Sequence, residues 1–562
     1  MLKVLLLTGG RARRAIVLAQ QIKRHVPGAM ICGIVYSVAL SSEGVLRLRF
    51  RVARSAGDWA ARLLLGVIHG GLPRAAEMAA SERSILARKC QQAGWDLCVT
   101  ENIESLDVHN FIREKEPNLA VATGLGSVPG TLSSLISQGI IQGQIFSLDK
   151  QGVEVPAPVK AATSVDTCRV KVTQLASQGE TLLARFDLSP DPLDTQVSLE
   201  LKGNLILRDL LVQSIAGIAE QPEKVTDRVE GWIRSMIPSY VSRTGTSEEN
   251  SLADQAPPLR VRATWKLCIY SLLLLFPSVI FRNWLRWWRK QHPVIFLNSH
   301  LISDRHHRMT LPTEAFLREV RYLQRHYRIV SLSKARELLK SGSIDEPTLV
   351  LTFDDGYEDN FVNLRAVSEE TGVPVVLFVS TDMVTQHREF THDSERGLVG
   401  FRALTWDQIR YWSSDDAEFG SHTCSHYDCG STDQAALTKE LEASRNALEV
   451  NLGKPITAFA FPFGKPKNMS APAMSIAAKL YDHYLSSFGG ENVPNASDNH
   501  KHLLRKHLQG NSWESELELQ DVFVIKKSLR RLIKIGHKNS YREAWDAAVA
   551  DADRKEAHVT GG

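Results

Sequence analysis

The sequence predicts an α/β protein built from two sheets, an open doubly wound sheet followed by a distorted, barrel-like one. The chain of 562 residues exceeds what one hydrophobic core usually organises, and its 43% hydrophobic content is ordinary for a soluble protein. Apolar runs of strand length alternate with stretches of helical periodicity in both halves. Such alternation is typical of parallel sheets covered by helices.

The first predicted domain covers residues 1–215. Residues 2–7 form an apolar strand that is too short for a signal peptide and lacks a small-residue cleavage site. A Gly-Gly turn at 9–10, a helical pattern at 15–19 and a second apolar strand at 30–36 follow, which predicts the doubly wound sheet. Because the GxGxxG fingerprint is not present, we interpret the glycines as a tight turn, with a phosphate-binding loop as the alternative.

Residues 118–124 and 139–144 resemble the core of the formyltransferase fold, as in methionyl-tRNA and sugar-nucleotide formyltransferases. The resemblance implies that an Asn, a His and a distal Asp position the formyl donor and handle the amine proton. The matching positions hold Gln142, Gln144 and Ser177 instead. Amides and an unassisted hydroxyl do not titrate near neutral pH, so none of them can act as a general base. We expect a catalytically inactive domain that binds a sugar or a protein partner, or that fixes the neighbouring domain.

A connector and an apolar segment separate the two predicted domains. Residues 216–262 are assigned as a linker, because 247–258 are rich in Ser, Glu and Pro. In the next segment, 263–290, the stretch from Leu267 to Phe281 is a nearly unbroken apolar run of 15 residues. A helix of that length covers about 22 Å, short of the ~30 Å hydrocarbon core of a bilayer, so a full membrane span is not expected.

The same segment has features of a membrane-interface anchor. Trp284, Trp287 and Trp288 lie among arginines just after the apolar run. Tryptophan rings sit at headgroup depth in bilayers, and cations there meet anionic lipids. We favour a monotopic anchor, with a helix packed between the two domains as the alternative.

The second predicted domain, residues 291–515, contains the residues of a metal site. An apolar strand ends in Asp354 and Asp355, as a buried parallel strand does when it delivers side chains to the mouth of a sheet or barrel. His422 and His426 are four residues apart, so their imidazoles can share one cation with Asp355. Two histidines and one carboxylate leave coordination positions open, which is typical of catalytic metal sites. The alternative is an ordinary Asp-Gly turn and two surface histidines.

The segments TFDDG, HTCSH and FPFG resemble the first three motifs of the NodB-type polysaccharide deacetylases, carbohydrate esterase family 4, which remove N-acetyl groups from amino sugars. The resemblance implies a distorted parallel barrel with fewer than eight units. The strand and helix patterns at 316–323, 335–339, 375–379 and 437–452 agree with it. The implied roles are a metal held by Asp355, His422 and His426, a general base at Asp354, and an oxyanion donor at the backbone N–H of Phe463 after Pro462.

This sequence departs from the family pattern at two points. Ala460 occupies the position where many members carry an arginine that orients the catalytic Asp. Arg505 lies in a segment that resembles the Leu-Pro-Arg-Ile segment of a subgroup, and it is the candidate substitute. The late histidine that serves as general acid has no secure counterpart, and the candidates are His300 at the end of the opening strand, His507 and a water.

Composition excludes one class of partner. The formal net charge of +4 is small, and no long basic run is interleaved with aromatic residues, so nucleic acid is not expected to bind. Seven scattered cysteines, odd in number, favour reduced thiols. The charged tail 516–562 is predicted to be a solvated helix, with contact to anionic lipid as the alternative. The sequence does not indicate an oligomeric state.

These patterns predict a metal-dependent hydrolase of carbon–nitrogen bonds that removes the N-acetyl group of an amino sugar, in a surface polysaccharide or a lipid-linked glycan of bacterial glycan biosynthesis. Zn²⁺ is the default metal by ligand type, with Co²⁺ or Ni²⁺ as alternatives. The rival hypotheses are a deformylase of a lipid-linked formamido sugar and a non-catalytic scaffold that binds glycan or a partner. Because no signal peptide is recognised, we expect a cytoplasmic protein, peripheral on the inner face of the membrane.

Overall fold

The computed structural model describes residues 1–9, 11–37, 82–125, 128–148, 154–156, 167–176, 179–242, 277–414, 416–495, 500–508, 510, 515 and 518–520. Contacts between Cα atoms divide the chain into two compact units. The first contains the described residues up to Ser242 together with 365–370, and the second contains the other described residues. Ser177, the apolar residues 267–276 and all but 518–520 of the predicted tail lie outside the described residues.

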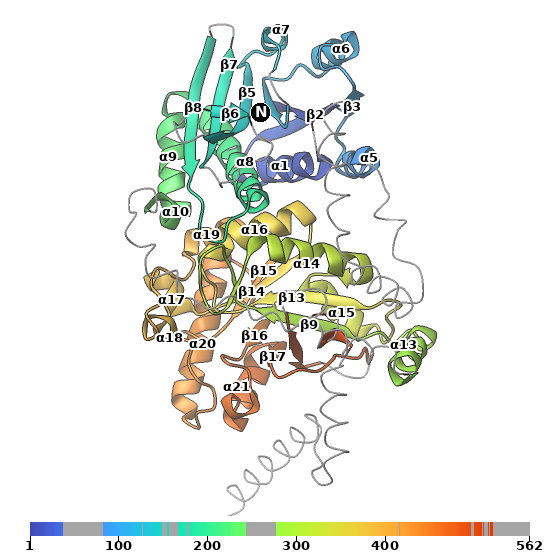
Figure 1. The fold of residues 1–562 in the computed structure, drawn as a ribbon, viewed down its shortest axis with the longest axis vertical. Helices are drawn as coiled ribbons and strands as arrows, with labels where there is room; N and C mark the ends of the chain where they lie inside the picture. Colours follow the sequence, from blue (N-terminus) through green and yellow to red (C-terminus); the bar gives the residue numbers. More distant parts are fainter. Residues whose placement is uncertain are drawn as a thin grey trace, which may run out of the picture. The chain divides into compact units, whose positions relative to one another are not determined.

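The first unit is built on a mixed eight-stranded sheet (Figure 1). Five parallel strands follow the order β3-β2-β1-β4-β5, and β7 and β8 extend the sheet in antiparallel fashion, while β6 also pairs with β5. The strand order reverses between β1 and β4, which confirms the predicted open doubly wound sheet. The strands are β1 (Leu2–Gly9), β2 (Ala29–Ser37), β3 (Leu97–Thr100), β4 (Leu119–Thr123), β5 (Ile140–Leu148), β6 (Glu154–Pro156), β7 (Cys168–Ala176) and β8 (Gly179–Leu188).

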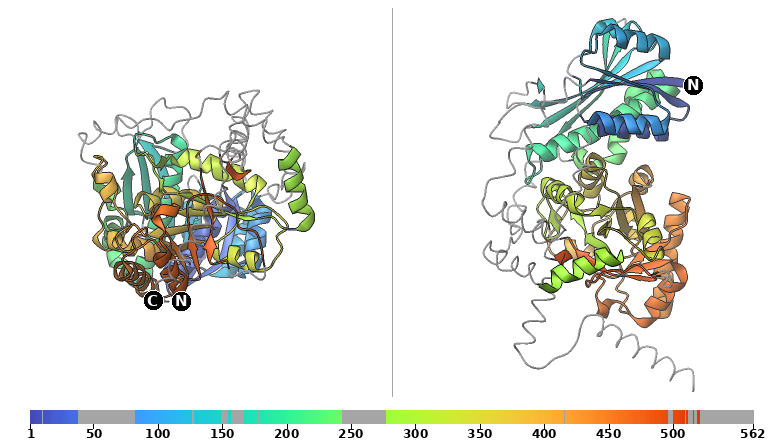
Figure 2. Two further views of the ribbon diagram at one scale, coloured as in Figure 1. Left: turned by 90° about the horizontal axis from the view of Figure 1, so that it is seen from below. Right: turned by 90° about the vertical axis from the view of Figure 1, so that its right-hand side faces the viewer.

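Helices cover both faces of this sheet (Figure 2). On one face, α6 (Leu106–Lys115) and α7 (Gly130–Ser133) share a core with buried residues of β1, β2 and β4. On the other face, α1 (Ala12–His25) contacts α8 (Gln196–Glu220). Helix α8 lies close to β5, because a Cβ atom added to Gly143 of β5 would be only 2.8 Å from Leu207 Cδ1 of α8. The remaining helices are α5 (Glu82–Ala93), η1 (Pro222–Lys224), α9 (Val225–Met236) and α10 (Pro238–Ser242).

The first unit extends past residue 215, where the sequence analysis placed its end. Helix α8 crosses that position without a break, because its side chains remain buried as far as Ile218. Val229 and Trp232 of α9 are also buried, so the residues from 216 to Ser242 belong to the first unit and not to a linker. The Ser-, Glu- and Pro-rich stretch that suggested the linker lies outside the described residues.

The second unit is built on a nine-stranded parallel sheet with the order β18-β17-β16-β15-β14-β13-β9-β19 and a short β12 beside β13. β18 and β19 are separated only by Leu504, yet β18 pairs with β17 and β19 pairs with β9. One extended segment, residues 502–507, therefore connects both ends of the sheet. The strands are β9 (Val294–Ser299), β12 (Arg328–Ile329), β13 (Thr348–Phe353), β14 (Val375–Val379), β15 (Ala417–Ser421), β16 (Ala458–Ala460), β17 (His483–Leu485), β18 (His502–Leu503) and β19 (Arg505–His507).

Helices alternate with these strands and lie around them (Figures 1 and 2). The patterns at 316–323, 335–339, 375–379 and 437–452 are confirmed by α14, α15, β14 and α20. Among the described residues, no helix has the length and apolar character that a membrane crossing needs, and the six described cysteines form no disulfide. The elements are α13 (Pro277–Arg289), β10 (Leu301–Ile302), β11 (Thr310–Leu311), α14 (Thr313–His326), α15 (Leu332–Lys340), α16 (Asp359–Thr371), α17 (Thr381–Gln386), α18 (Thr391–Ser394), α19 (Trp406–Trp412), α20 (Gln434–Leu452), η3 (Pro466–Asn468) and α21 (Ala471–Leu480).

The core of the second unit brings neighbouring strands together around buried apolar side chains. Phe296, Val350, Val376, Phe378 and Leu485 are among its fully buried members. Because the strands of this sheet are parallel, the residues that follow each strand emerge at the same end. That end is where the candidate catalytic residues of the sequence analysis lie.

The core leaves no space for a side chain at Gly420 of β15. A Cβ atom there would lie 2.5 Å from Phe378 Cε1 and 2.9 Å from Ala458 O. We expect Gly420→Ala to lower the free energy of unfolding by about 1–3 kcal/mol through overpacking, as measured by urea unfolding followed by circular dichroism. Gly231→Ala in α9 is the control, because nothing lies within 4 Å of a Cβ there. Equal stability of the two variants would contradict the packing described.

Candidate active site

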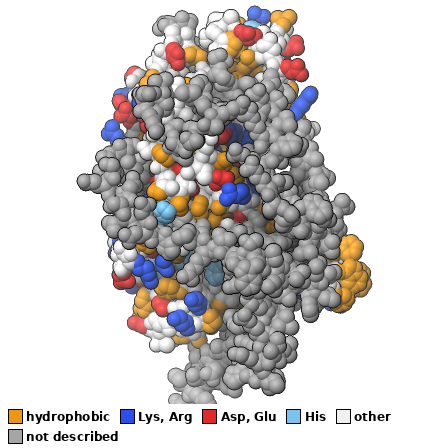
Figure 3. All heavy atoms as spheres, viewed as in Figure 1, with side chains coloured by type: hydrophobic (Ala, Val, Ile, Leu, Met, Phe, Trp, Pro, Cys, Tyr) orange, Lys and Arg blue, Asp and Glu red, His pale blue; other side chains and the backbone are white. Residues whose placement is uncertain are grey.

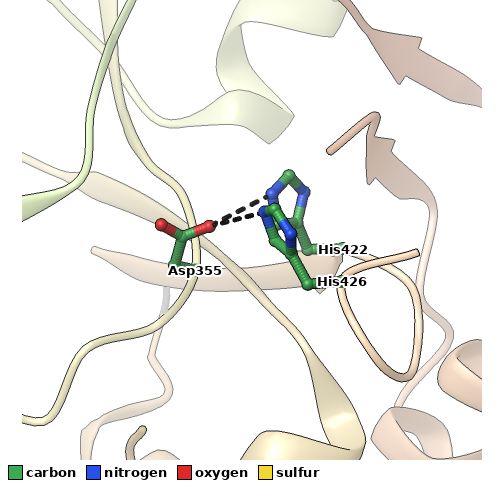
Figure 4. Close-up of side chains that lie close together, drawn as sticks. All are labelled: Asp355, His422 and His426. Atoms are coloured by element: carbon green, nitrogen blue, oxygen red, sulfur yellow. Dashed lines mark ion pairs between the residues drawn. The ribbon is translucent and has the colours of Figure 1, made fainter. Parts of the chain in front are cut away.

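Asp355, His422 and His426 converge at the carboxyl end of the second sheet (Figure 4). Asp355 comes shortly after β13, and the two histidines follow β15. Asp355 Oδ1 lies 3.4 Å from His422 Nε2 and 3.2 Å from His426 Nε2. The ligand atoms of all three residues lie within 4.8 Å of one another, so the structure brings together the three residues that the sequence analysis selected.

The hydrogen bonds around this cluster favour a cation between the three side chains. His422 Nδ1 donates to Ala460 O at 2.7 Å, so Nε2 of the neutral ring directs a lone pair toward Asp355. Asp355 Oδ1 is buried and receives no hydrogen bond from the described residues. Electron pairs that face one another in a buried site are unfavourable unless a cation lies between them. One carboxylate oxygen and two imidazole nitrogens fit Zn²⁺, Co²⁺ or Ni²⁺.

The charges of the cluster are coupled. Burial alone would raise the pKa of Asp355, but the two histidines outweigh burial and hold this pKa well below its usual value. Burial would lower the pKa of His426, and the nearby Asp355 carboxylate outweighs it and raises that pKa. Asp355 is therefore ionised at neutral pH, as a metal ligand must be.

Left-handed backbone conformations set the directions of the Asp355 and His426 side chains. Asp355, Thr423 and His426 have φ angles of 70°, 64° and 61°, which residues other than glycine rarely adopt. Each such conformation costs roughly 1–3 kcal/mol and persists where the surroundings enforce it. Glu440 of α20 holds the histidine loop, because its carboxylate accepts two backbone N–H groups of the loop at 2.8 and 3.0 Å.

Asp354 is buried at the same end of the sheet and is paired with Arg505. Two hydrogen bonds, at 2.7 and 2.8 Å, join the guanidinium to the carboxylate, and both side chains are buried. Burial alone would raise the pKa of Asp354, but Arg505 and then His422 outweigh it and lower this pKa. Asp354 is thus a carboxylate at neutral pH and can accept a proton. The guanidinium also donates to Ser486 O, Ser487 Oγ and Thr352 Oγ1.

Arg505 therefore occupies the position that the sequence analysis proposed for it. It reaches Asp354 from β19, whereas Ala460, which stands where many deacetylases carry the arginine, lies on β16. The backbone carbonyl of Ala460 accepts a hydrogen bond from His422 Nδ1. The arginine that pairs with Asp354 thus comes from β19 and not from β16.

The two histidines proposed as general acids, His300 and His507, lie near the ion pair between Asp354 and Arg505. His300 follows β9 and is half-buried, and its charge contributes to lowering the pKa of both Asp354 and Asp355. His507 ends β19 and has exposed surface. Desolvation, then the charges of His300 and Arg505, lower the pKa of His507. His507 is therefore mostly neutral near pH 7, and it would have to take up a proton before it could give one to a leaving amine.

Phe463 and Pro462 form part of the rim of the site. The Phe463 ring is half-exposed and meets the His426 ring edge-on, with centroids 4.9 Å apart. Its φ is 61°, and the next residue, Gly464, packs so tightly that a Cβ atom would lie 2.7 Å from Ser487 N. No described residue accepts the Phe463 N–H, so this donor is available to an oxyanion.

A polar cluster beside the site was not predicted from the sequence. Tyr357 OH donates to Asp393 Oδ2 at 2.6 Å and lies 3.1 Å from His392 Nε2. His307 Nε2 approaches the other oxygen of Asp393 at 3.0 Å. The His392 ring, which is partly exposed, stands 5.4 Å from the His426 ring between centroids. The available sequence signal was Tyr357, which directly follows the Asp-Asp-Gly triplet.

The glutamines of the formyltransferase-like positions lie in the first unit. Gln142 and Gln144 are two apart on β5, so they point to the same face of the sheet. Gln142 is buried and stands opposite Thr173 of β7, while Gln144 is half-buried opposite Lys171. The third position, Ser177, lies outside the described residues.

Residues 341–480 match the family model of polysaccharide deacetylases. This range contains Asp354, Asp355, His422, His426 and Phe463, so the resemblance that rested on their motifs is confirmed. The second unit thus contains a polysaccharide deacetylase domain, a hydrolase domain for carbon–nitrogen bonds other than peptide bonds. Arg505 and His300 lie outside the matched range.

Comparison with known proteins found likenesses to both halves of the chain. A gellan lyase of Bacillus sp is 25% identical over 201 residues, which are 35% of this chain and 7% of the lyase. The deacetylase PplD of Streptococcus pyogenes is 20% identical with a TM-score of 0.33, covering 40% of this chain and 96% of PplD. A phosphoribosylglycinamide formyltransferase of Anaplasma phagocytophilum is 14% identical with a TM-score of 0.25, covering 39% and 87%. The chain spans a small part of the lyase, and likenesses at these TM-scores carry no functional argument.

We expect the purified protein to bind about one divalent ion per chain, because three ligands converge on one point. Asp355→Asn and His422→Ala should each lose this ion, since either change removes one of the three ligands. Metal content after dialysis, measured by inductively coupled plasma mass spectrometry, is the readout. Asp407→Asn, which changes an exposed carboxylate of α19, is the control. Full metal content in both site variants would show that the ligands are assigned wrongly.

Removal of the Arg505 charge should raise the pKa of Asp354, because the arginine helps to hold it below its ordinary value. In Arg505→Gln the acidic limb of the pH–rate profile should therefore move to higher pH, whereas Arg505→Lys, which keeps the charge, should move it less. Arg445→Gln, which removes an ion pair with Glu449 on α20, is the matched control. Identical acidic limbs in Arg505→Gln and the wild type would refute the coupling.

Proposed function

We propose that this chain is a metal-dependent deacetylase that hydrolyses the N-acetyl amide of an amino sugar in a polysaccharide or a lipid-linked glycan. One observation carries the proposal, namely the convergence of three ligand atoms beside the buried carboxylate of Asp354. Amide hydrolysis needs both an electrophile for the carbonyl and a base for water. The family match at 341–480 and the likeness to a gellan lyase support a polysaccharide as the substrate class.

Each residue of the site has a role in this reaction. A divalent cation held by Asp355, His422 and His426 would supply Lewis acidity. Asp354 accepts the proton of the attacking water, and Arg505 keeps the carboxylate ionised and oriented for that step. The Phe463 N–H donates to the carbonyl oxygen as negative charge develops on it. The carbon–nitrogen bond breaks, the amine takes a proton from His507, His300 or water, and acetate and a free amino sugar result.

The metal and the setting are part of the same proposal. We propose Zn²⁺, because one carboxylate and two imidazoles with open positions are the ligand set of catalytic zinc sites. We also propose a role in bacterial glycan biosynthesis for a cytoplasmic protein on the inner face of the membrane, where lipid-linked sugars would be within reach.

The proposal is tested by measuring the acetate or formate that the protein releases from acetylated and formylated amino-sugar oligomers. We expect the wild type to release acetate, and Asp354→Asn to keep its metal while losing about 10²–10⁴-fold in kcat/KM, because the general base is gone. Asp407→Asn is again the matched carboxylate control. Faster release of formate than of acetate would reassign the enzyme as a deformylase. No release of either acid by metal-loaded protein would overturn the proposal in favour of a non-catalytic scaffold.

A further inference from the structure

Helix α13 turns its aromatic residues away from the unit that it packs on. Phe281, Trp284, Trp287 and Trp288 are exposed by 60%, 52%, 65% and 63%. The Trp284 and Trp288 rings are stacked, with centroids 6.3 Å apart and planes within 5°, and Phe281 lies 5.8 Å from Trp284. We call these four residues the aromatic face. A group of hydrophobic side chains is visible at the right-hand edge of Figure 3, on the side where Figure 1 shows α13.

The opposite side of α13 is polar and holds the helix to the second unit. Arg286 forms an ion pair with Glu491, and both side chains are largely buried. Burial alone would raise the pKa of Glu491, but Lys506, Arg286 and Arg282 outweigh it and lower this pKa to about 2. Further contacts join Arg282 to Gln520 O at 3.1 Å and Asn283 to Gln520 Oε1 at 3.0 Å.

This orientation is the reverse of that found in ordinary surface helices. Such helices bury their apolar stripe against the core and expose their charged side. Turning α13 about its axis to cover the aromatic rings would break its contacts with Glu491 and Gln520. The fold keeps these polar contacts and leaves the rings outside, and a contiguous exposed patch of this kind marks an interaction site.

We infer that the aromatic face binds the headgroup region of an anionic lipid bilayer. Tryptophan favours that depth over both water and hydrocarbon. Arg289, the last residue of the helix, is exposed and supplies positive charge for anionic lipids, while the exposed Lys290 after it lies 3.5 Å from Asp345 Oδ1. The inference does not rest on the proposed function.

Vesicle binding by the full chain tests this inference. We expect the wild type to cosediment with vesicles of phosphatidylcholine and phosphatidylglycerol, and several-fold less with phosphatidylcholine alone. Changing Trp284, Trp287 and Trp288 together to Ser should weaken binding about tenfold or more and reduce the quenching of tryptophan fluorescence by brominated lipid. Val450→Ser, at an exposed hydrophobic residue of α20, should leave binding unchanged. Unchanged thermal unfolding shows that the triple variant is folded.

Each other outcome counts against the inference. Wild-type protein that binds neither vesicle, or a triple variant that binds as well as the wild type, overturns it. Self-association that the triple variant loses, without vesicle binding by the wild type, would assign the aromatic face to a second copy of the chain. Because vesicle binding needs no substrate, a protein that binds vesicles but hydrolyses nothing would overturn the proposed function alone.

Discussion

The buried ion pair between Asp354 and Arg505 is the interaction on which the rest of the site depends. A guanidinium removed from water is unfavourable, and here the carboxylate, a backbone carbonyl and two hydroxyls offset that cost. Breaking such a pair from one side typically costs about 3–5 kcal/mol, because the remaining charge stays buried. The pair also joins the end of β13 to β19, the strand that reaches β9. Arg505 therefore both pairs with the base and lies on the strand that completes the sheet.

Around this pair the protein maintains arrangements that an isolated chain would avoid. Asp355, His426 and Phe463 all hold left-handed backbone conformations. Strained backbone conformations are common at functional sites, where contacts with the surrounding structure hold them in place. Glu440 supplies part of that support from outside the ligand set, through the N–H groups of the histidine loop. A divalent cation would be held by Asp355 and the two histidines of this cluster.

The parts of the site that the sequence could predict are local. Asp354 with Asp355, and His422 with His426, lie next to strand ends and are recognisable by spacing alone, whereas Arg505 needed a family resemblance because it is 151 residues from its partner. The Tyr357 and Asp393 cluster was missed, since its members come from separate segments with no fixed spacing, namely the turn after β13, the segment before β11 and helix α18. The first domain was ended too early because α8 continues its burial beyond residue 215. The sequence also indicated the tryptophans of α13, but the direction of their rings depends on Glu491, which is 205 residues from Arg286.

The segment 502–507, which connects both ends of the second sheet, has a consequence for the order in which the protein matures. During synthesis β9 and β13 leave the ribosome long before β19, and contacts between such distant parts of a chain form late in folding. A nascent chain that stops short of β19 already carries Asp354 and the three ligands, but it lacks Arg505, whose guanidinium pairs with Asp354. One late strand therefore completes both the sheet and the ion pair of the base.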